Sequence, residues 1–253
     1  MQKCELLLIS VLPESLRNLS CLSLYAVAEA DNIAVRLLFI PQKSKYQETE
    51  LSHFLINHAF DVVGISVTTG DFHFCAKLTS HIRKYLPSAH VVWGGIHPLS
   101  KPEECLIHAD SICIGEGETT LINLLKNLRS QSDISNIPGI GIKEIDKIVL
   151  NPPPPLQNNL NAFPFPRYDF NHFHVLDENG LHPFTHLDYV RYSKHRGEDY
   201  TIMTSRSCPF RCSFCINSFL NRVLQDSGKI RRRSVDSVID EIIYARSQMP
   251  GIG

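Results

Sequence analysis

The stretch "DVVGISVTTGD" (residues 61–71) begins as a short apolar run and ends in a turn rich in threonine and glycine. Apolar residues occupy both faces of Asp61–Thr68, which is typical of a strand buried on both sides in a parallel sheet. Segments with helical spacing of apolar residues separate four further runs of this kind, and the βαβα order predicts a doubly wound α/β domain. The four runs are Glu5–Leu12, Ala34–Ile40, His90–Gly95 and Ser111–Ile114.

Loops with unusual composition follow three of these predicted strands. They read "VTTGD", "GGIHP" and "GEGETT". Glycine allows a backbone to approach a flat ligand closely, and ligands of such folds bind at the carboxyl ends of the strands. Each loop taken alone is also explained by ordinary turn chemistry. Three such loops on one edge of a sheet favour a binding site.

Composition limits the class of protein. The chain has 253 residues, of which 43% are hydrophobic and 20% charged, and its formal net charge is −1. These values indicate a globular protein without a surface for nucleic acid or anionic membrane. No apolar run approaches the roughly 20 residues that span a bilayer, and residues 6–12 are too short a run for a signal peptide. We therefore expect a cytoplasmic protein whose thiols stay reduced.

Proline dominates the next part of the chain. "NPPPPL" (residues 151–156) and "FPFPRYDF" (residues 163–170) exclude helix interior, because proline lacks an amide hydrogen. We expect a hairpin of Gly139–Lys143 and Ile148–Leu150, followed by an irregular linker. Tyr200–Ser205 is expected to form a strand. Ser234 is expected to cap a helix with an apolar face, made of Val235, Val238, Ile239 and Ile242.

The stretch "RSCPFRCSFC" (residues 206–215) places Cys208, Cys212 and Cys215 in a C-x3-C-x2-C spacing. A structural zinc site needs four ligands, usually from two separated pairs, and no second pair follows here. A [4Fe–4S] cluster held by three thiolates fits the number of cysteines better, with one iron left open. Zinc and unliganded thiols remain as alternatives.

This motif, with Pro209 after the first cysteine and Phe214 before the third, resembles that of the radical S-adenosylmethionine (SAM) enzymes. Ser207 departs from their common form, which has glycine at this position. The resemblance implies that Cys208, Cys212 and Cys215 bind three irons and that the fourth chelates SAM. Reductive cleavage of SAM to a 5′-deoxyadenosyl radical would follow, and Phe214 would pack near the adenine.

The first 130 residues resemble the cobalamin-binding domain that precedes the radical domain in one subgroup of these enzymes. The resemblance rests on "DVVGISVTTGD", "VVWGGIHPLSKPEECL" and "SICIGEGETTLINLL". It implies a flavodoxin-like cobalamin-binding domain (1–135), a connector (136–197) and the first β/α unit of a partial barrel (198–253). By position, the corrin pocket would be lined by Thr68, Thr69, Gly94, Gly95, His97, Gly115, Glu116, Gly117 and Glu118.

Three further features have simpler readings. "DFHFCA" (residues 71–76) approximates a cobalt-binding histidine motif, but Ala76 replaces its glycine, so His73 is expected only to begin a helix with Asp71 as N-cap. "KIRRRS" (residues 229–234) is expected to be a solvated surface turn rather than a nucleic-acid patch. The scattered cysteines are expected to be core residues: Cys4, Cys21, Cys75, Cys105 and Cys113.

The combined reading is a cobalamin-dependent radical SAM enzyme that performs C-methylation or ring formation on a small molecule, with a flavodoxin- or ferredoxin-type electron donor. One alternative is a tRNA methylthiotransferase-like enzyme. Another is a corrinoid-binding fragment without catalysis, because the 38 residues after Cys215 hold about one β/α unit. We therefore expect a fragment of a longer protein. No catalytic residue, substrate or oligomeric state follows from the sequence.

Overall fold

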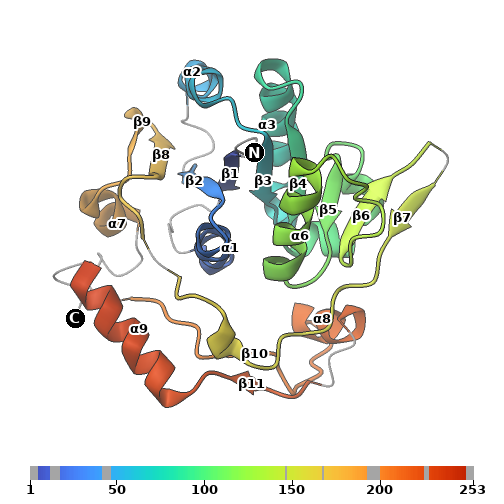
Figure 1. The fold of residues 1–253 in the computed structure, drawn as a ribbon, viewed down its shortest axis with the longest axis vertical. Helices are drawn as coiled ribbons and strands as arrows, with labels where there is room; N and C mark the ends of the chain where they lie inside the picture. The colour runs from blue at the N-terminus through green and yellow to red at the C-terminus, as the bar shows by residue number, and fades with distance from the viewer. Residues whose placement is uncertain are drawn as a thin grey trace.

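The computed structural model describes residues 5–11, 18–41, 47–145, 147–166, 168–192, 200–224 and 228–248. Its centre is a nine-stranded sheet of order β7-β6-β5-β4-β3-β1-β2-β8-β9, and Figure 1 shows the helices on both faces of this sheet. The five strands expected from the first 130 residues are β1 (Glu5–Ser10), β2 (Ala34–Phe39), β3 (Val62–Ser66), β4 (His90–Gly94) and β5 (Ser111–Cys113). Leu12, the predicted end of the first strand, lies outside the described residues.

These five strands are parallel, and their spatial order 5-4-3-1-2 confirms the flavodoxin-like, doubly wound prediction. The order reverses between β1 and β3, where Leu6 pairs with Val62 and Ser10 with Ser66. Chain connections leave such a point in opposite directions, so a crevice opens at the carboxyl ends of these strands. The topology therefore sets the position of a ligand site before any side chain is considered.

Helices α1 (Leu19–Ala30) and α6 (Gly117–Arg129) cover one face, while α2 (Glu48–His58) and α3 (Phe72–Tyr85) cover the other. The predicted helical spacing in α3 is confirmed, because Cys75, Leu78 and Ile82 are fully buried. Short helices α4 (Ile96–Ser100) and α5 (Pro102–Cys105) and the turn η1 (Thr69–Asp71) follow β3 and β4. Burial of the sheet between two apolar layers is the main stabilising term of this fold.

The predicted hairpin is confirmed as β6 (Ile140–Lys143) and β7 (Ile148–Leu150), which extend the sheet antiparallel to β5. The expectation of an irregular linker after it is wrong in part. Strands β8 (Phe173–Asp177) and β9 (Gly180–Pro183) join the opposite edge, β8 parallel to β2, and α7 (His186–Tyr192) follows. The domain boundaries at 135 and 197 stay predictions, and the second lies in residues that the structure does not describe.

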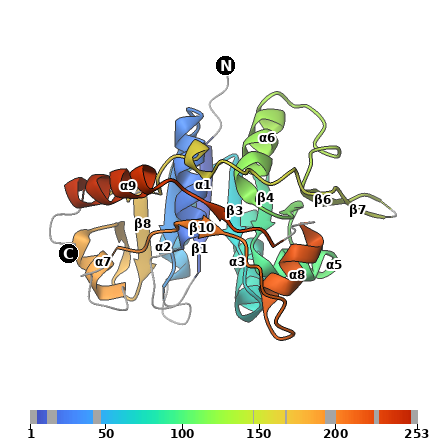
Figure 2. The ribbon, with the colours of Figure 1, turned by 90° about the horizontal axis from the view of Figure 1, so that it is seen from below.

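Residues 200–248 cross one side of this sheet, as Figure 2 shows. They form β10 (Ser205–Arg206), α8 (Ile216–Val223), β11 (Arg231–Arg232) and α9 (Val235–Gln248), whereas the turn η2 (Leu160–Ala162) lies earlier in the chain, before β8. The strand expected over Tyr200–Ser205 reduces to the two residues of β10, because its partner β11 is equally short. The predicted cap of α9 is confirmed, since the Ser237 amide donates to Ser234 Oγ at 3.2 Å.

Candidate functional site

A cavity of about 630 Å³ opens at the carboxyl ends of β1, β3, β4 and β5. Its floor includes Ser66, Val67 and Thr68 after β3, and Gly94, Gly95 and Ile96 after β4. Its roof comes from residues far along the chain: Met203, Ser205, Arg206, Ser207, Asn217, Leu220, Asn221, Leu224 and Arg231. The cavity therefore lies between the sheet and the segment that carries the three-cysteine motif.

Nine residues were expected from the sequence to line a pocket at the strand ends. Seven of them line this cavity and are called its rim: Thr68, Gly94, Gly95, Gly115, Glu116, Gly117 and Glu118. Thr69 and His97 are not among its lining residues. His97 is 4% exposed and packs on Phe72 behind the floor, and its amide donates to the carbonyl of Val67 at 3.2 Å. Burial lowers the pKa of His97. Its ring is therefore neutral and packs behind the turn formed by Gly94 and Gly95.

Glycine keeps the floor clear of side chains. An added Cβ at Gly94 would make an ordinary van der Waals contact with the Cys113 side chain at 3.8 Å, so that position could hold a side chain without a clash. Gly95 has φ +102, and an added Cβ would lie 2.8 Å from the carbonyl oxygen of Val67. Gly115 has φ +104, and its Cβ would meet Pro153 at 3.0 Å and Leu224 at 3.1 Å. Only glycine satisfies both the backbone conformation and the close approach at these last two positions.

The cavity extends inward between the sheet and helices α1 and α6. Its lining there includes Leu24, Leu121 and Leu124, together with the thiols of Cys21 and Cys113. Burial raises the pKa of both thiols to about 12, and for Cys113 the Glu118 carboxylate adds to this shift. Both are therefore neutral and act as apolar lining. Cys21 and Cys113, expected from the sequence to be core residues, also face a cavity.

Sequence reasoning also missed the contribution of α1. Asn18, Ser20 and Ser23 line the cavity beside Cys21. Asn18 caps this helix by accepting from the Cys21 amide at 3.2 Å, and it donates to Ser10 Oγ at 3.0 Å. The run of small and polar residues in "NLSCLS" is the signal that could have indicated a helix face that leaves space for a ligand.

His73 is exposed at the start of α3 and does not line the cavity. Asp71 holds the N-cap position, as expected, but its carboxylate accepts from the Thr68 hydroxyl at 2.6 Å. This contact fixes the turn after β3, and through it the position of Thr68 on the cavity floor.

The three cysteines of the motif lie on the loop between β10 and α8, where Cys208 and Cys215 are partly buried and Cys212 is exposed. Asn221 Nδ2 donates to the Cys208 carbonyl at 2.9 Å, and Ser218 Oγ donates to the Cys212 carbonyl at 2.8 Å. Phe214 is 91% exposed and lies outside the cavity lining. Within the described ranges, no three metal-ligating side chains are already gathered around a common point.

Four charged side chains connect this loop to the cavity rim. Arg231 donates to Glu116 at 2.5 and 3.0 Å, and Arg206 donates to Glu118 at 2.5 Å. Burial disfavours the charge on Arg206, but the Glu118 carboxylate more than offsets this and raises its pKa. The expectation of a solvated turn is therefore wrong for Arg231, which is 7% exposed and paired within the protein.

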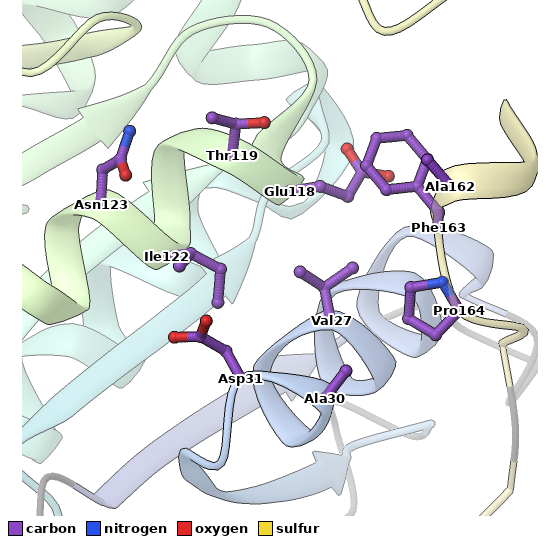
Figure 3. Close-up of a pocket in the computed structure, with 10 residues that line it drawn as sticks. All are labelled: Val27, Ala30, Asp31, Glu118, Thr119, Ile122, Asn123, Ala162, Phe163 and Pro164. Carbon is purple, nitrogen blue, oxygen red and sulfur yellow. The ribbon is translucent and has the colours of Figure 1, made fainter. Parts of the chain in front are cut away.

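A second cavity of about 330 Å³ lies between α1, α6 and residues 162–164. Figure 3 shows Glu118 at its edge beside Phe163, with Val27 and Ile122 on the two helices. Arg206 lies 5.2 Å from the centre of the Phe163 ring. Glu118 thus stands between the two cavities, and its ion pair with Arg206 is covered by an aromatic ring.

Residues 6–125 match the family model of the B12-binding domain. This first half of the chain therefore belongs to the B12-binding domain family. An uncharacterized methyltransferase of Pyrococcus horikoshii is 33% identical over 189 residues, which cover 72% of this chain and 36% of the relative. The cobalamin-dependent radical SAM methyltransferase TokK of Streptomyces tokunonensis is 26% identical over 162 residues, which cover 61% of this chain and 22% of TokK.

The chain also matches a solved structure over most of its length. The radical SAM methyltransferase TsrM of Kitasatospora setae, with tryptophan and a SAM analogue bound, superposes with a TM-score of 0.75 at 20% identity. The match covers 98% of this chain and 46% of TsrM. It shows a common fold, with the three-cysteine segment included. The chain spans about a third of the Pyrococcus relative and under half of TsrM. None of the helices within the described ranges has both the length and the apolar character needed to cross a bilayer.

Proposed function

We propose that the cavity at the strand ends binds cobalamin and that Cys208, Cys212 and Cys215 hold a [4Fe–4S] cluster that binds SAM, as part of a radical enzyme acting on a small molecule. Methylation is the reaction that the relatives favour, because two of those described above are named as radical SAM methyltransferases. The observation that carries the proposal is the cavity itself, which the B12-binding domain and the cysteine segment line together.

The residues present fit cobalamin. Gly94, Gly95, Gly115 and Gly117 present backbone rather than side chains to the cavity at the strand ends, where a flat macrocycle can approach closely. The inward extension between α1 and α6 is apolar and accepts a side arm of the ligand. A histidine ligand to the cobalt is not part of the proposal, because His73 is exposed and His97 lies behind the floor.

The chemistry of the loop fits an iron–sulfur cluster. It offers three thiols within eight residues, and hydrogen bonds from Asn221 and Ser218 fix the carbonyls of two of them. Three thiolates leave one iron of a cubane cluster open, which is the position that SAM requires. Phe214 is proposed to cover the adenine of SAM, and its present exposure leaves it free to do so.

When bound, the cluster supplies one-electron chemistry and cobalamin supplies group transfer. The residues at the strand ends would hold the cobalamin, and the loop of Cys208, Cys212 and Cys215 would hold the cluster. Leu220 of α8 and Leu224, which follows the helix, supply an apolar roof, and Glu116 and Glu118 hold that roof to the rim through Arg231 and Arg206. Excluding water from such a space protects reactive species from quenching. The electron is proposed to come from a flavodoxin- or ferredoxin-type donor.

Anaerobic reconstitution with iron and sulfide tests the cluster assignment. The wild-type chain should take up iron and show the broad visible absorption of an iron–sulfur cluster. Cys212→Ala should abolish both, while the neighbouring Ser213→Ala should retain them, since Ser213 is an exposed residue of the same loop. Stoichiometric zinc without iron uptake would show that the three thiols serve a different metal.

A further inference from the structure

Ser207, the residue before the first cysteine of the motif, has a backbone conformation that serine rarely adopts. Its φ is +77, in the left-handed region that a residue with a side chain adopts only under strain. Serine therefore occupies a position that glycine would fill without strain. Surrounding contacts must hold Ser207 in this strained conformation. Because Cys208 is the next residue, the same contacts also affect the position of the first cysteine.

The contact that can hold it comes from Arg231. The Nε and Nη2 atoms of Arg231 both lie 3.4 Å from Ser207 Oγ, and Nη1 donates to the carbonyl of Gln157 at 3.0 Å. The same guanidinium forms the two-pronged ion pair with Glu116. A planar guanidinium can make all these contacts at once, which a lysine ammonium cannot.

The ladder of β10 and β11 makes this arrangement depend on the rim of the cavity. Arg206 and Arg231 are directly opposite each other in the two strands, where like charges repel. Glu116 and Glu118 compensate these charges: Arg231 pairs with Glu116, and Arg206 pairs with Glu118 and also lies 3.4 Å from Glu116. Both glutamates belong to the loop and first turn at the start of α6, and both line the large cavity.

We propose that Arg231 is a positioning residue for the cysteine loop: it holds Ser207 in the left-handed conformation and ties Cys208 to Glu116 on the cavity rim. The role of the loop as a cluster site rests on the function proposed above, whereas the contact between Arg231 and Ser207 does not. The contact between the serine hydroxyl and Arg231 stabilises a backbone conformation that glycine would adopt without any such contact. The arrangement also fixes the distance between the cysteine loop and the cavity floor.

Two substitutions at one position separate this role from a general structural one. Ser207→Ala removes the hydroxyl and keeps the side chain at φ +77, so the loop should loosen. Ser207→Gly removes the same hydroxyl but adopts this φ freely. We expect amide exchange over residues 205–212 to become about tenfold faster in the alanine variant and to stay within about threefold of wild type in the glycine variant.

Arg231→Gln should speed exchange over the same residues, and the added change Ser207→Gly should restore most of the protection. Arg83→Gln is the control, because Arg83 forms a partly buried ion pair with Asp110 away from the cavity. Protection of β1 and β3 in each variant verifies that the sheet has folded. The measurement uses the whole chain without cofactors, and iron retention after reconstitution is the second readout.

Equal exchange in Ser207→Ala and Ser207→Gly, or no rescue of Arg231→Gln by Ser207→Gly, would overturn the proposal. If Arg231→Gln does not fold, the comparison of the two Ser207 variants decides alone. A wild-type chain that takes up no iron while the exchange pattern holds would instead overturn the proposed cluster and leave the role of Arg231 in the loop standing.

Discussion

Arg231 and Glu116 lie 115 residues apart in the chain and form a two-pronged ion pair with N–O distances of 2.5 and 3.0 Å. This pair joins the segment that carries the cysteines to the loop that follows the fifth strand of the B12-binding domain. Removing one member of such a buried pair leaves the other charge without compensation. The two parts of the proposed cofactor site are therefore held in one arrangement by charge as well as by apolar packing.

Gly94→Val should weaken cobalamin binding by at least about tenfold without unfolding the chain. The added side chain enters the cavity, because an added Cβ at Gly94 has no protein atom closer than 3.8 Å, and steric exclusion of this size costs at least about 1.4 kcal/mol. Gly70→Val is the control, since Gly70 has comparable open space and does not line the cavity. Equilibrium dialysis with hydroxocobalamin measures the effect, and equal affinities in the two variants would place the ligand elsewhere.

His73→Ala should leave the absorption spectrum of bound cobalamin unchanged. The ring of His73 is exposed at the start of α3, outside the cavity lining, and cannot reach a metal held there. Titration of both proteins with cobalamin, followed by visible spectroscopy, measures this. A spectral change in the variant would mean that a histidine ligand had been discounted wrongly.

Asn221→Ala should lower the amount of iron that the reconstituted chain retains. Its side-chain amide donates to the carbonyl of Cys208 at 2.9 Å, and the loss of such a bond leaves a partly buried acceptor unsatisfied, at about 1–2 kcal/mol. Ser213→Ala, on the same loop, should retain iron as wild type does. The iron-to-protein ratio after gel filtration decides, and equal retention would show that the loop needs no such support.

His174 should make the free energy of unfolding depend on pH. Burial, with the positive charge of Arg36, lowers the pKa of His174 to about 4 in the folded chain, against an ordinary value of 6.5. Between pH 6.5 and pH 4 the unfolded chain binds a proton at His174 that the folded chain does not bind. The contribution of His174 to the free energy of unfolding is therefore fully present above pH 6.5 and is lost as the pH falls towards 4. The expected loss from this residue between pH 7 and pH 5 is about 2 kcal/mol.

His174→Phe should reduce this loss, because phenylalanine fills the same place beside Phe54 and binds no proton. Urea unfolding at pH 7 and pH 5 gives the two free energies for each protein. His73→Ala serves as the control and should keep the wild-type dependence on pH. A slope in His174→Phe as steep as that of wild type would assign the effect to other groups, such as His58 or His90, whose pKa values burial also lowers.

The sequence predicted the sheet of the B12-binding domain well, because each of its strands is a short apolar run with a turn signal at its end. It predicted less after residue 150. The run Phe173–Pro183 forms a hairpin on the far edge of the sheet; Glu178 and Asn179 make its turn, and Gly180, with φ +94, begins the second strand opposite Asp177. An Asn-Gly pair between two apolar runs is a hairpin signal, but the prolines before it favoured the reading of a linker.

Most of the rim residues could be predicted, because glycine-rich loops at strand ends have few other reasons to gather on one edge. The roof could not. Arg206 and Arg231 were not distinguished from solvated arginines, since pairing with Glu116 and Glu118 depends on contacts 88 and 115 residues away in the chain. His97 appeared equivalent to its glycine neighbours by position, and only the packing against Phe72 places it behind the floor.

Iron and cobalt counted on one sample test the central claim most directly. The wild-type chain is reconstituted anaerobically with iron, sulfide and hydroxocobalamin, passed through gel filtration, and analysed by mass spectrometry of its metals. The account predicts about four irons and one cobalt per chain, with iron lost in Cys212→Ala and cobalt lost in Gly94→Val. A wild-type chain that retains zinc in place of iron, or that retains no cobalt, would contradict it.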